Sequence, residues 1–322
     1  MSKKRSYVDT LMAIQDCKRI FESQLEVRLD LVKVQSPIFV KVSTGLQDDL
    51  TGVEKGVGFK KGGERFEIVH SLAKWKRMSL GKYSIPMHKG IYTDMKAIRK
   101  GEKVDRIHSL FVEQWDWEKV IDKQDRTIDY LKDIVKSIYK AIRQTSIILK
   151  KKYHYLSLDL PKTVYFVTSQ ELEDMYPDKK PIEREQLIGK EKRAVFIIGI
   201  GGRLKSGRVH DKRSPDYDDW SLNGDLLIYD KVIDETIEIS SMGIRVDEDS
   251  LKKQLEIDER LDKMQMPFHK QILEKKIPYS IGGGIGQSRI LMLLLEKSHI
   301  AEVQASYWEE KVEKQFSDIR VL

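Results

Sequence analysis

The feature that most constrains the fold is a glycine-rich stretch near the C-terminus, residues 279–296, which holds four glycines within five positions. A short β-prone run precedes the glycines, and an apolar run of helical length follows them. The pattern predicts a strand that ends at the glycines and a helix that begins at about Gln287. A flat or charged ligand can lie against such bare backbone, and Arg289 can stack on its ring or pair with its phosphate. The alternative is a glycine-rich turn before a core helix, with Arg289 as a surface charge.

Size and composition indicate a globular protein with one domain. The chain has 322 residues and 40% hydrophobic content, and it shows no repeat, low-complexity segment or linker, so we expect a single domain over residues 1–322. The single cysteine, Cys17, excludes an internal disulfide and indicates a reducing, cytoplasmic setting. There is no apolar run of membrane-spanning length and no signal-peptide core after the first five residues.

The net charge of +7 is a weak argument for a nucleic-acid partner. The 58 Lys and Arg residues are nearly matched by 51 Asp and Glu residues, and the two signs are interspersed along the chain. A positive surface of this kind also favours anionic small molecules such as ATP. We therefore expect small-molecule substrates, with no nucleic acid and no membrane as partners.

The order of predicted elements favours an α+β fold, an antiparallel sheet flanked by helices, over a parallel doubly wound sheet. The predicted helices are 6–30, one with Ser71 as its N-cap, 127–150, one capped by Thr168 and Glu171, and 249–264. The predicted strands are 31–42 around Pro37, 66–69, 91–99, 109–118, 163–167, 194–200, 225–229 and 236–241, with a polar excursion at 203–223.

Two predicted strands, 91–99 and 109–118, form an antiparallel hairpin with polar residues on one face. Gln114 and Asp116 alternate along the second strand, so they share one side of the sheet, and Trp115 and Trp117 face the core. Arg99 ends the first strand. Burying such a polar cluster costs free energy unless the charges of a ligand satisfy it. The alternative for Arg99 is an ordinary charged residue in a surface loop.

A second polar face is predicted on the strand 236–241. Alternation places Glu238 and Ser240 on one side, opposite Ile237 and Ile239, and Asp225 begins the preceding strand. Two carboxylates with room for water suit Mg²⁺, which arrives bridging ATP phosphates. The alternative is an ordinary exposed strand face.

Several of these segments resemble the class II aminoacyl-tRNA synthetases. The pattern Gly-Ile-Gly-x-x-Arg that ends at Arg289 resembles their motif 3. The long first helix and the strand with Pro37 resemble motif 1, which forms the dimer interface in that family. The hairpin resembles motif 2, in which an Arg at the position of Arg99 contacts the α-phosphate of ATP. Here Lys100-Gly101 separates Arg99 from the acidic residue that usually follows it closely.

Two further segments are similar to parts of the aspartyl and asparaginyl synthetases. Residues 71–76 look like a segment whose Lys, matched here by Lys76, grips the side-chain carboxylate of aspartate. Residues 236–245 look like the Glu-to-Arg stretch of those enzymes, with Glu238 and Arg245 at the matching positions, but this chain has Ser-Ser-Met-Gly where those enzymes carry a glycine run. All matches occur in the family's order. The resemblance implies a class II synthetase-like catalytic domain with no residues left for an anticodon-binding domain.

A catalytic domain of this kind without an anticodon-binding domain, and with the sequence runs found here, resembles the ammonia-dependent asparagine synthetases, or aspartate–ammonia ligases. The similar runs are 47–48, 69–77, 114–118, 215–220 and 240–245. The resemblance implies a homodimer that converts aspartate, ATP and ammonia to asparagine, AMP and pyrophosphate through β-aspartyl-AMP, with Mg²⁺ as cofactor. Glutamine-dependent synthetases are excluded, because they need a nucleophilic Cys at the mature N-terminus and the single cysteine here, Cys17, lies in the predicted helix 6–30.

The resemblance also implies roles for individual residues. The catalytic residues are Asp48, Arg99 and Gln114; the ATP-binding residues are Arg99, Val112, Glu238 and Arg289; the substrate-binding residues are Asp48, Lys76, Gln114, Asp116, Asp218, Ser241 and Arg245; and the metal ligands are Asp225 and Glu238. Ammonium needs a carboxylate that attracts it and accepts its proton, and between Asp48 and Asp218 we favour Asp48.

Two other functions stay open on the sequence. One is a synthetase-like enzyme that adenylates an amino acid for another acceptor. The other is a non-catalytic paralogue that binds tRNA or regulates a partner; that function predicts loss of Arg99, Glu238 or Arg289, and all three are present.

Overall fold

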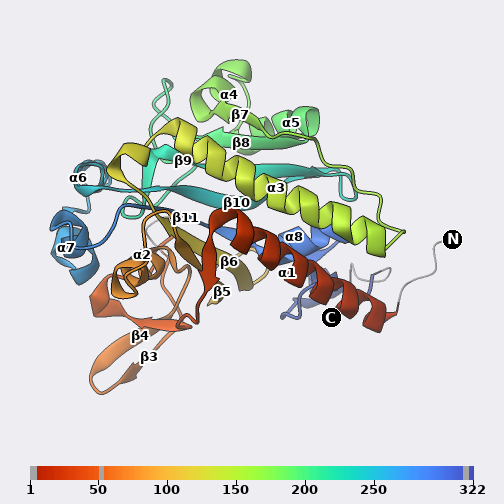
Figure 1. Cartoon of the computed structure of the whole chain (residues 1–322), viewed down its shortest axis with the longest axis horizontal. Helices are drawn as coiled ribbons and strands as arrows, with labels where there is room; N and C mark the ends of the chain where they lie inside the picture. Colours follow the sequence, from red (N-terminus) through yellow and green to blue (C-terminus); the bar gives the residue numbers. More distant parts are fainter. Residues whose placement is uncertain (1–5, 51–53, 315–318) are drawn as a thin grey trace.

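The computed structural model describes residues 6–50, 54–314 and 319–322, and within these ranges its centre is a large sheet (Figure 1). The sheet has eight strands, of which the β1–β5 and β7–β8 pairs are parallel and the other neighbours antiparallel. This confirms the predicted α+β class. In spatial order its strands are β1 (Leu31–Lys33), β5 (Gly90–Ile98), β6 (Phe111–Val120), β11 (Ser280–Gly286), β10 (Glu235–Arg245), β9 (Asp218–Asp230), β8 (Ala194–Ile198) and β7 (Tyr165–Thr168).

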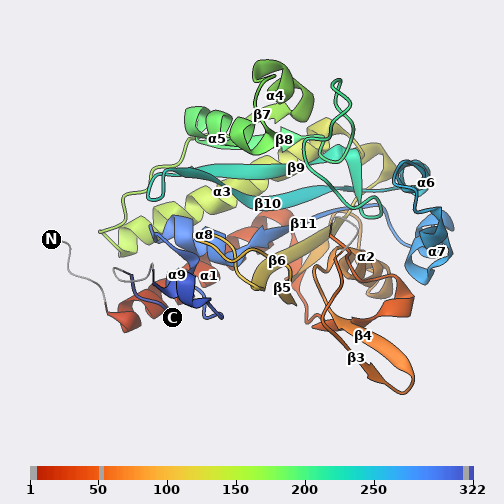
Figure 2. The same cartoon turned by 180° about the vertical axis from the view of Figure 1, so that it is seen from behind.

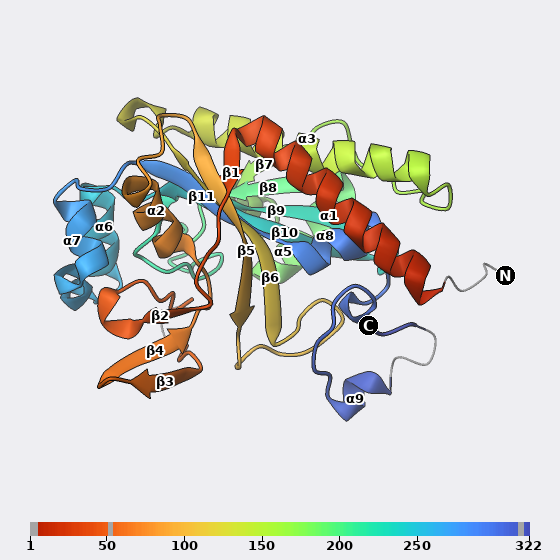
Figure 3. The ribbon, with the colours of Figure 1, turned by 60° about the horizontal axis from the view of Figure 1, so that its bottom comes forward.

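Helices cover both faces of the sheet, and α1 and α3 lie side by side on one of them (Figures 1 and 3). Ser6 caps α1, because its hydroxyl accepts a hydrogen bond from the Asp9 amide. The helices are α1 (Tyr7–Leu29), α2 (Ala73–Lys82), α3 (Ile128–Lys152), α4 (Ser169–Met175), α5 (Pro181–Lys192), α6 (Glu248–Ile257), α7 (Pro267–Leu273), α8 (Gln287–Leu294) and α9 (Glu310–Glu313). Short 3-10 turns are η1 (Val42–Thr44), η2 (Lys123–Asp125), η3 (Leu261–Gln265) and η4 (Ile300–Glu302). None of the helices in the described ranges has the length and apolar character needed to cross a membrane.

The main core lies between the sheet and α1, α3 and α8. Phe21 of α1 and Trp115 of β6 are both fully buried, with ring centroids 4.6 Å apart. Trp117 is buried in the same cluster, as the alternation along β6 predicts. The opposite face of β6, β11 and β10 carries the polar residues, between α2 on one side and the loop that precedes β9 on the other (Figure 2).

The glycine-rich stretch folds differently from the prediction. Helix α8 begins at Gln287 as expected, but the strand does not end at the glycines, because β11 runs through all of them between β6 and β10. A Cβ at Gly282 would lie 1.9 Å from Glu118 Oε2, and one at Gly284 would lie 2.5 Å from Gln114 Oε1. The glycines therefore give clearance to polar side chains of the neighbouring strands.

The prediction that residues 31–42 form one strand was wrong. It forms β1 in the main sheet and β2 (Phe39–Lys41) in a separate three-stranded sheet of order β2-β4-β3, and Pro37 lies between the two. The small sheet, with β3 (Gly58–Lys61) and β4 (Glu64–Ile68), lies beside α2 (Figure 3). A proline cannot donate to a strand ladder, which is why the chain changes sheets there.

Other element boundaries in the structure also differ from the predicted ones. The helix predicted at 249–264 ends at Ile257, and the polar excursion ends where β9 begins, at Asp218. Ser71 is not the N-cap of α2; Leu72 is, without a side-chain hydrogen bond, and the Ser71 hydroxyl donates to Asp48 and accepts from the Ala73 amide at 3.4 Å.

Candidate active site

The polar face of β6, β11 and β10 forms the floor of two adjoining cavities. Arg99, Gln114, Glu238 and Gly284 line both cavities. Of the residues proposed from the sequence, the first cavity is lined by Asp48, Lys76, Arg99, Gln114, Asp116, Asp218, Glu238, Ser241 and Arg245. The second is lined by Arg99, Val112, Gln114, Glu238 and Arg289. The structure thus brings these residues together, and Asp225 lies next to the first cavity, in contact with Ser241.

Buried ion pairs form the floor of the first cavity. Arg245 donates from Nη2 to Glu118 Oε2 at 2.7 Å and also pairs through Nη1 with Asp218. Burial alone would lower the pKa of Arg245, because it disfavours the charged guanidinium. The carboxylates of Glu118 and Asp218 have the larger effect, and they raise that pKa above its ordinary value. Lys76 Nζ donates to the Gly283 carbonyl at 2.9 Å and lies 3.4 Å from Asp116 Oδ1. Burial lowers the pKa of Lys76, and Asp116 opposes that change.

Asp48 lies in a buried turn at the edge of this cavity. Its Oδ2 accepts a hydrogen bond from the Ser71 hydroxyl at 2.5 Å, and its Oδ1 accepts one from the Leu50 amide at 2.8 Å. Gln47 anchors the turn, because its Nε2 donates to the Ile68 carbonyl at 2.8 Å and its Oε1 accepts from the His70 amide at 3.2 Å. The carboxylate of Asp48 is therefore held in one orientation at the cavity wall.

Arg99 stands where the two cavities meet. Its Nε and Nη2 donate to the His70 carbonyl at 3.4 and 3.3 Å, and the side chain is half-buried. Gln114 faces the same space from β6, opposite Gly286 of β11 in the ladder. A guanidinium at such a junction can contact groups in both cavities.

The carboxylates proposed as metal ligands are bridged by a serine. Ser241 Oγ lies 2.6 Å from Asp225 Oδ1 and 3.0 Å from Glu238 Oε1. The prediction that Glu238 shares a face with Ser240 was wrong, since the β9–β10 pairing shifts between these two residues. The shift brings Ser241 to Glu238, and buried Ser240 donates to the Gly284 carbonyl at 2.8 Å.

Arg213 is a cavity residue that the sequence reasoning missed. It comes from the loop before β9, and its Nη2 lies 2.5 Å from Asp225 Oδ1. Burial disfavours the charge of Arg213, but Asp225 raises its pKa well above the ordinary value. Lys212 lines the same cavity. The only indication in the sequence was the polar character of the segment 203–223, and that does not show which of its Lys and Arg side chains points into the cavity.

The residues present fit a Mg²⁺ ion that arrives with a nucleotide. Asp225 and Glu238 offer carboxylate oxygens and Ser241 offers a hydroxyl, which are the hard ligands that Mg²⁺ prefers. Burial raises the pKa of Asp225 to about 6; Arg213 opposes the rise, and the charge of Glu238 adds to it. Within residues 6–50, 54–314 and 319–322, no three His, Cys, Asp or Glu side chains are arranged to hold a metal ion, so most ligands would come from phosphate and water.

The second cavity has a mixed wall suited to a flat ring with a polar tail. Its apolar residues include Ile107, Phe111 and Val112. Arg289 forms one side, because its Nη1 donates to the Glu238 carbonyl at 2.8 Å and its Nε donates to the Ile107 carbonyl at 3.4 Å. These bonds hold the plane of the guanidinium, and a planar guanidinium can stack on a ring.

Comparisons with known proteins point to one family. The family model described as "Aspartate-ammonia ligase" matches residues 8–320. The chain is 55% identical over 305 residues to the aspartate–ammonia ligase of Clostridium perfringens (strain 13 / Type A), covering 94% of this chain and 91% of that protein. It is 52% identical over 306 residues to the protein of the same name from Fusobacterium nucleatum, covering 95% of this chain and 94% of that protein.

Solved structures share the fold at low sequence identity. The asparaginyl-tRNA synthetase of Pyrococcus horikoshii, complexed with asparaginyl-adenylate, matches with a TM-score of 0.67 and 16% identity over 92% of this chain and 68% of that chain. The aspartyl-tRNA synthetase of Entamoeba histolytica matches with a TM-score of 0.60 and 16% identity over 92% of this chain and 57% of that chain. The fold is therefore that of the class II synthetase catalytic domain.

Proposed function

The chain belongs to the aspartate–ammonia ligase family, and from this premise we propose that it makes asparagine by way of an adenylate. As a member of that family it is an enzyme that joins ammonia to aspartate. We propose that ATP activates the β-carboxylate of aspartate, that β-aspartyl-AMP forms with release of pyrophosphate, and that ammonia then displaces AMP.

The observation that carries this proposal is the junction of the two cavities. One cavity is lined by buried charges and the other by a mixed wall of polar and apolar residues with Arg289, and both reach Arg99, Gln114 and Glu238. An acyl adenylate forms only where a carboxylate meets the α-phosphate of a nucleotide. Negative charge builds on that phosphate during the attack, and a fixed guanidinium at the meeting point stabilises it. Arg99 is the residue in that position.

The charges of the first cavity suggest how aspartate lies. We infer that its α-carboxylate faces Lys76 and Arg245 and that its β-carboxylate faces Arg99. The α-ammonium then meets Asp116 or Asp218, each of which already faces one of those cations. In aspartyl-tRNA synthetases the matching cations hold the side-chain carboxylate, so the substrate is reversed here.

The amidation step needs a group that attracts ammonium and takes its proton. Asp48 suits this role, because its carboxylate lies at the wall of the charged cavity and Ser71 and the Leu50 amide fix its orientation. Gln114 can donate to the acyl oxygen or accept from the amine.

The proposed Mg²⁺ would be held by Asp225 and Glu238 together with phosphate oxygens. When bound, it supplies positive charge that offsets the negative charge of the phosphates. The chain's own residues near it, Arg213 and Arg289, carry charge of the same sign, with Arg213 held 2.5 Å from Asp225 and Arg289 held at the Glu238 carbonyl. Arg213 would be released toward phosphate oxygens if a cation took over Asp225, whereas Arg289 stays bonded to the backbone carbonyl of Glu238.

Product analysis tests this function. The protein is incubated with aspartate, ATP, Mg²⁺ and ammonium, and asparagine, AMP and pyrophosphate should appear in equal amounts. Formation of ADP and phosphate would contradict the adenylate. If aspartate-dependent ATP–pyrophosphate exchange occurs but asparagine does not form with ammonium, the chain adenylates an amino acid for a different acceptor.

A further inference from the structure

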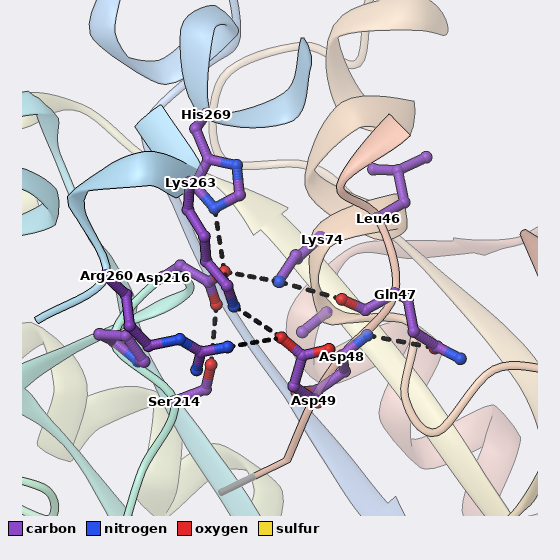
Figure 4. A network of polar contacts seen from close by, with 12 residues as sticks. Leu46, Gln47, Asp48, Asp49, Lys74, Ser214, Asp216, Arg260, Lys263 and His269 are labelled. Carbon is purple, nitrogen blue, oxygen red and sulfur yellow. Dashed lines mark hydrogen bonds and ion pairs between the residues drawn. The ribbon is translucent and has the colours of Figure 1, made fainter. Parts of the chain in front are cut away.

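A buried ionic cluster centred on Asp216 lies behind the turn that carries Asp48 (Figure 4). The Asp216 side chain has no exposed surface, and its Oδ2 lies 2.6 Å from Lys74 Nζ, 3.2 Å from Lys263 Nζ and 2.9 Å from His269 Nε2. Its Oδ1 accepts from the Ser214 hydroxyl at 2.8 Å. The cluster joins three parts of the chain that are far apart in the sequence: α2, the loop before β9, and the neighbouring segments η3 and α7.

Both lysines of the cluster, Lys74 and Lys263, also contact the residues on either side of Asp48 in the chain. Lys74 Nζ also donates to the Gln47 carbonyl at 3.0 Å, and Lys263 Nζ also donates to Asp49 Oδ2 at 2.7 Å. Residues 47 and 49 are thus each tied to Asp216 through a lysine, with Asp48 between them (Figure 4). As the structure describes them, neither Lys74 nor Lys263 belongs to the wall of either cavity.

The electrostatics of the cluster favour a rigid arrangement. Burial disfavours the ionised form of Asp216, but Lys74, His269 and Lys263 hold its pKa well below the ordinary value. Burial lowers the pKa of His269 despite Asp216, so its ring is neutral near pH 7. Replacing a buried ion pair with apolar residues often leaves stability unchanged or raises it, so stability alone is a poor reason for such a cluster. Its directional bonds do fix where the attached backbone lies.

We propose that Lys74, Asp216 and Lys263 are positioning residues that hold Asp48 where its carboxylate receives ammonium; this rests on the function proposed above. On the side of Asp49, Lys263 and Arg260 both donate to Asp49 Oδ2, at 2.7 and 2.9 Å. Loss of one lysine removes one of the ties that hold a neighbour of Asp48 and leaves the substrate-contacting side chains in place. A displacement of about 1 Å of a catalytic group costs on the order of 100-fold in rate. The ammonia step therefore depends on the cluster, and formation of the adenylate does not.

Lys263→Met in the full chain tests the inference, with Lys270→Met, an exposed lysine of α7, as the matched control. Two rates separate the steps: aspartate-dependent ATP–pyrophosphate exchange without ammonia, and asparagine formation at varied ammonium. We expect Lys263→Met to keep the exchange rate and the aspartate KM within twofold while its ammonium KM rises at least fivefold. The control should change neither.

Asp49→Asn is the second variant, because Asp49 is partly exposed and its loss is less disruptive to folding than the loss of a buried lysine. It removes the same tie from the other end and should raise the ammonium KM in the same way, whether or not Lys263→Met folds. An ammonium KM that is unchanged in a folded Lys263→Met or in Asp49→Asn, or an exchange rate that falls in proportion to amidation, overturns the inference. A wild-type protein that forms no asparagine with ammonium overturns the proposed function instead.

Discussion

Gly282→Ala should be among the most damaging single substitutions in the sheet, although it adds only one methyl group. The new Cβ would lie 1.9 Å from Glu118 Oε2 and 2.5 Å from Arg245 Nη2. Both side chains belong to a buried ion pair with a 2.7 Å contact, and β11 is an interior strand that cannot shift away. The carboxylate must therefore leave the guanidinium, and a buried pair broken in this way costs about 3–5 kcal/mol.

The size of the effect can be stated as a change in Tm. With a transition entropy of about 2.1 cal/mol/K per residue, a loss of about 4 kcal/mol lowers the Tm of a 322-residue chain by about 6 °C. Gly286→Ala is the matched control on the same strand, because its Cβ would meet no atom closer than 3.7 Å, and it should shift Tm by about 1 °C. Differential scanning calorimetry measures both. Equal Tm values for Gly282→Ala and wild type would show that clearance is not why glycine stands there.

Further predictions concern the site, the pH dependence and the assembly. Arg289→Ala should abolish aspartate-dependent ATP–pyrophosphate exchange without changing Tm; a folded variant with normal exchange would make Arg289 a surface charge. Lys76→Ala should raise the aspartate KM at least tenfold and leave the ATP KM within twofold, and β-alanine, which lacks the α-carboxylate, should be a very poor substrate. Asp216→Asn should lower the free energy of unfolding at pH 7. Because the fold holds the pKa of Asp216 well below its ordinary value of 3.8, the unfolded chain binds the proton first as pH falls below 3.8, and the deficit of the variant should then shrink. Urea titrations between pH 3 and 7 that show a constant deficit would refute this. Light scattering should give a dimer of the 37.6 kDa chain, and a monomer would refute the interface expected from the helix and strand with Pro37.

The polar face of the hairpin could be predicted from the sequence because its cause is local. Gln114 and Asp116 alternate with Trp115 and Trp117, and the pleat of a strand alone sends the two pairs to opposite faces. The start of α8 at Gln287 also follows from a local change of pattern. The order of the family motifs also predicted that Lys76, Arg99 and Arg289 belong to one site; Lys76 and Arg99 line the first cavity, and Arg99 and Arg289 line the second.

The glycine strand could not be predicted, because its reason lies on other strands. By propensity alone, glycine weakens a strand, so a run of glycines indicates a turn. The requirement at Gly282 comes from Glu118 and Arg245, which reach the same point from β6 and β10. No window of sequence around residue 282 contains that information.

The same limit applies to Arg213 and to the cluster around Asp216. Asp216 meets Lys74, which is 142 positions away, and His269, which is 53 positions away. Before folding, each is one charged residue among many in a chain with 34% charged residues. The β-bulge that joins Glu238 to Ser241 is hidden for a different reason, since one extra residue reverses the alternation without a glycine to mark it.

Isotope transfer from aspartate tests the adenylate most directly. Aspartate carrying ¹⁸O in both oxygens of its β-carboxylate is converted with ATP, Mg²⁺ and ammonium, and the products are analysed by mass spectrometry. If the β-carboxylate attacks the α-phosphorus at the junction around Arg99, one ¹⁸O atom must appear in each AMP and none in pyrophosphate. Label in inorganic phosphate, or AMP without label, would contradict the account.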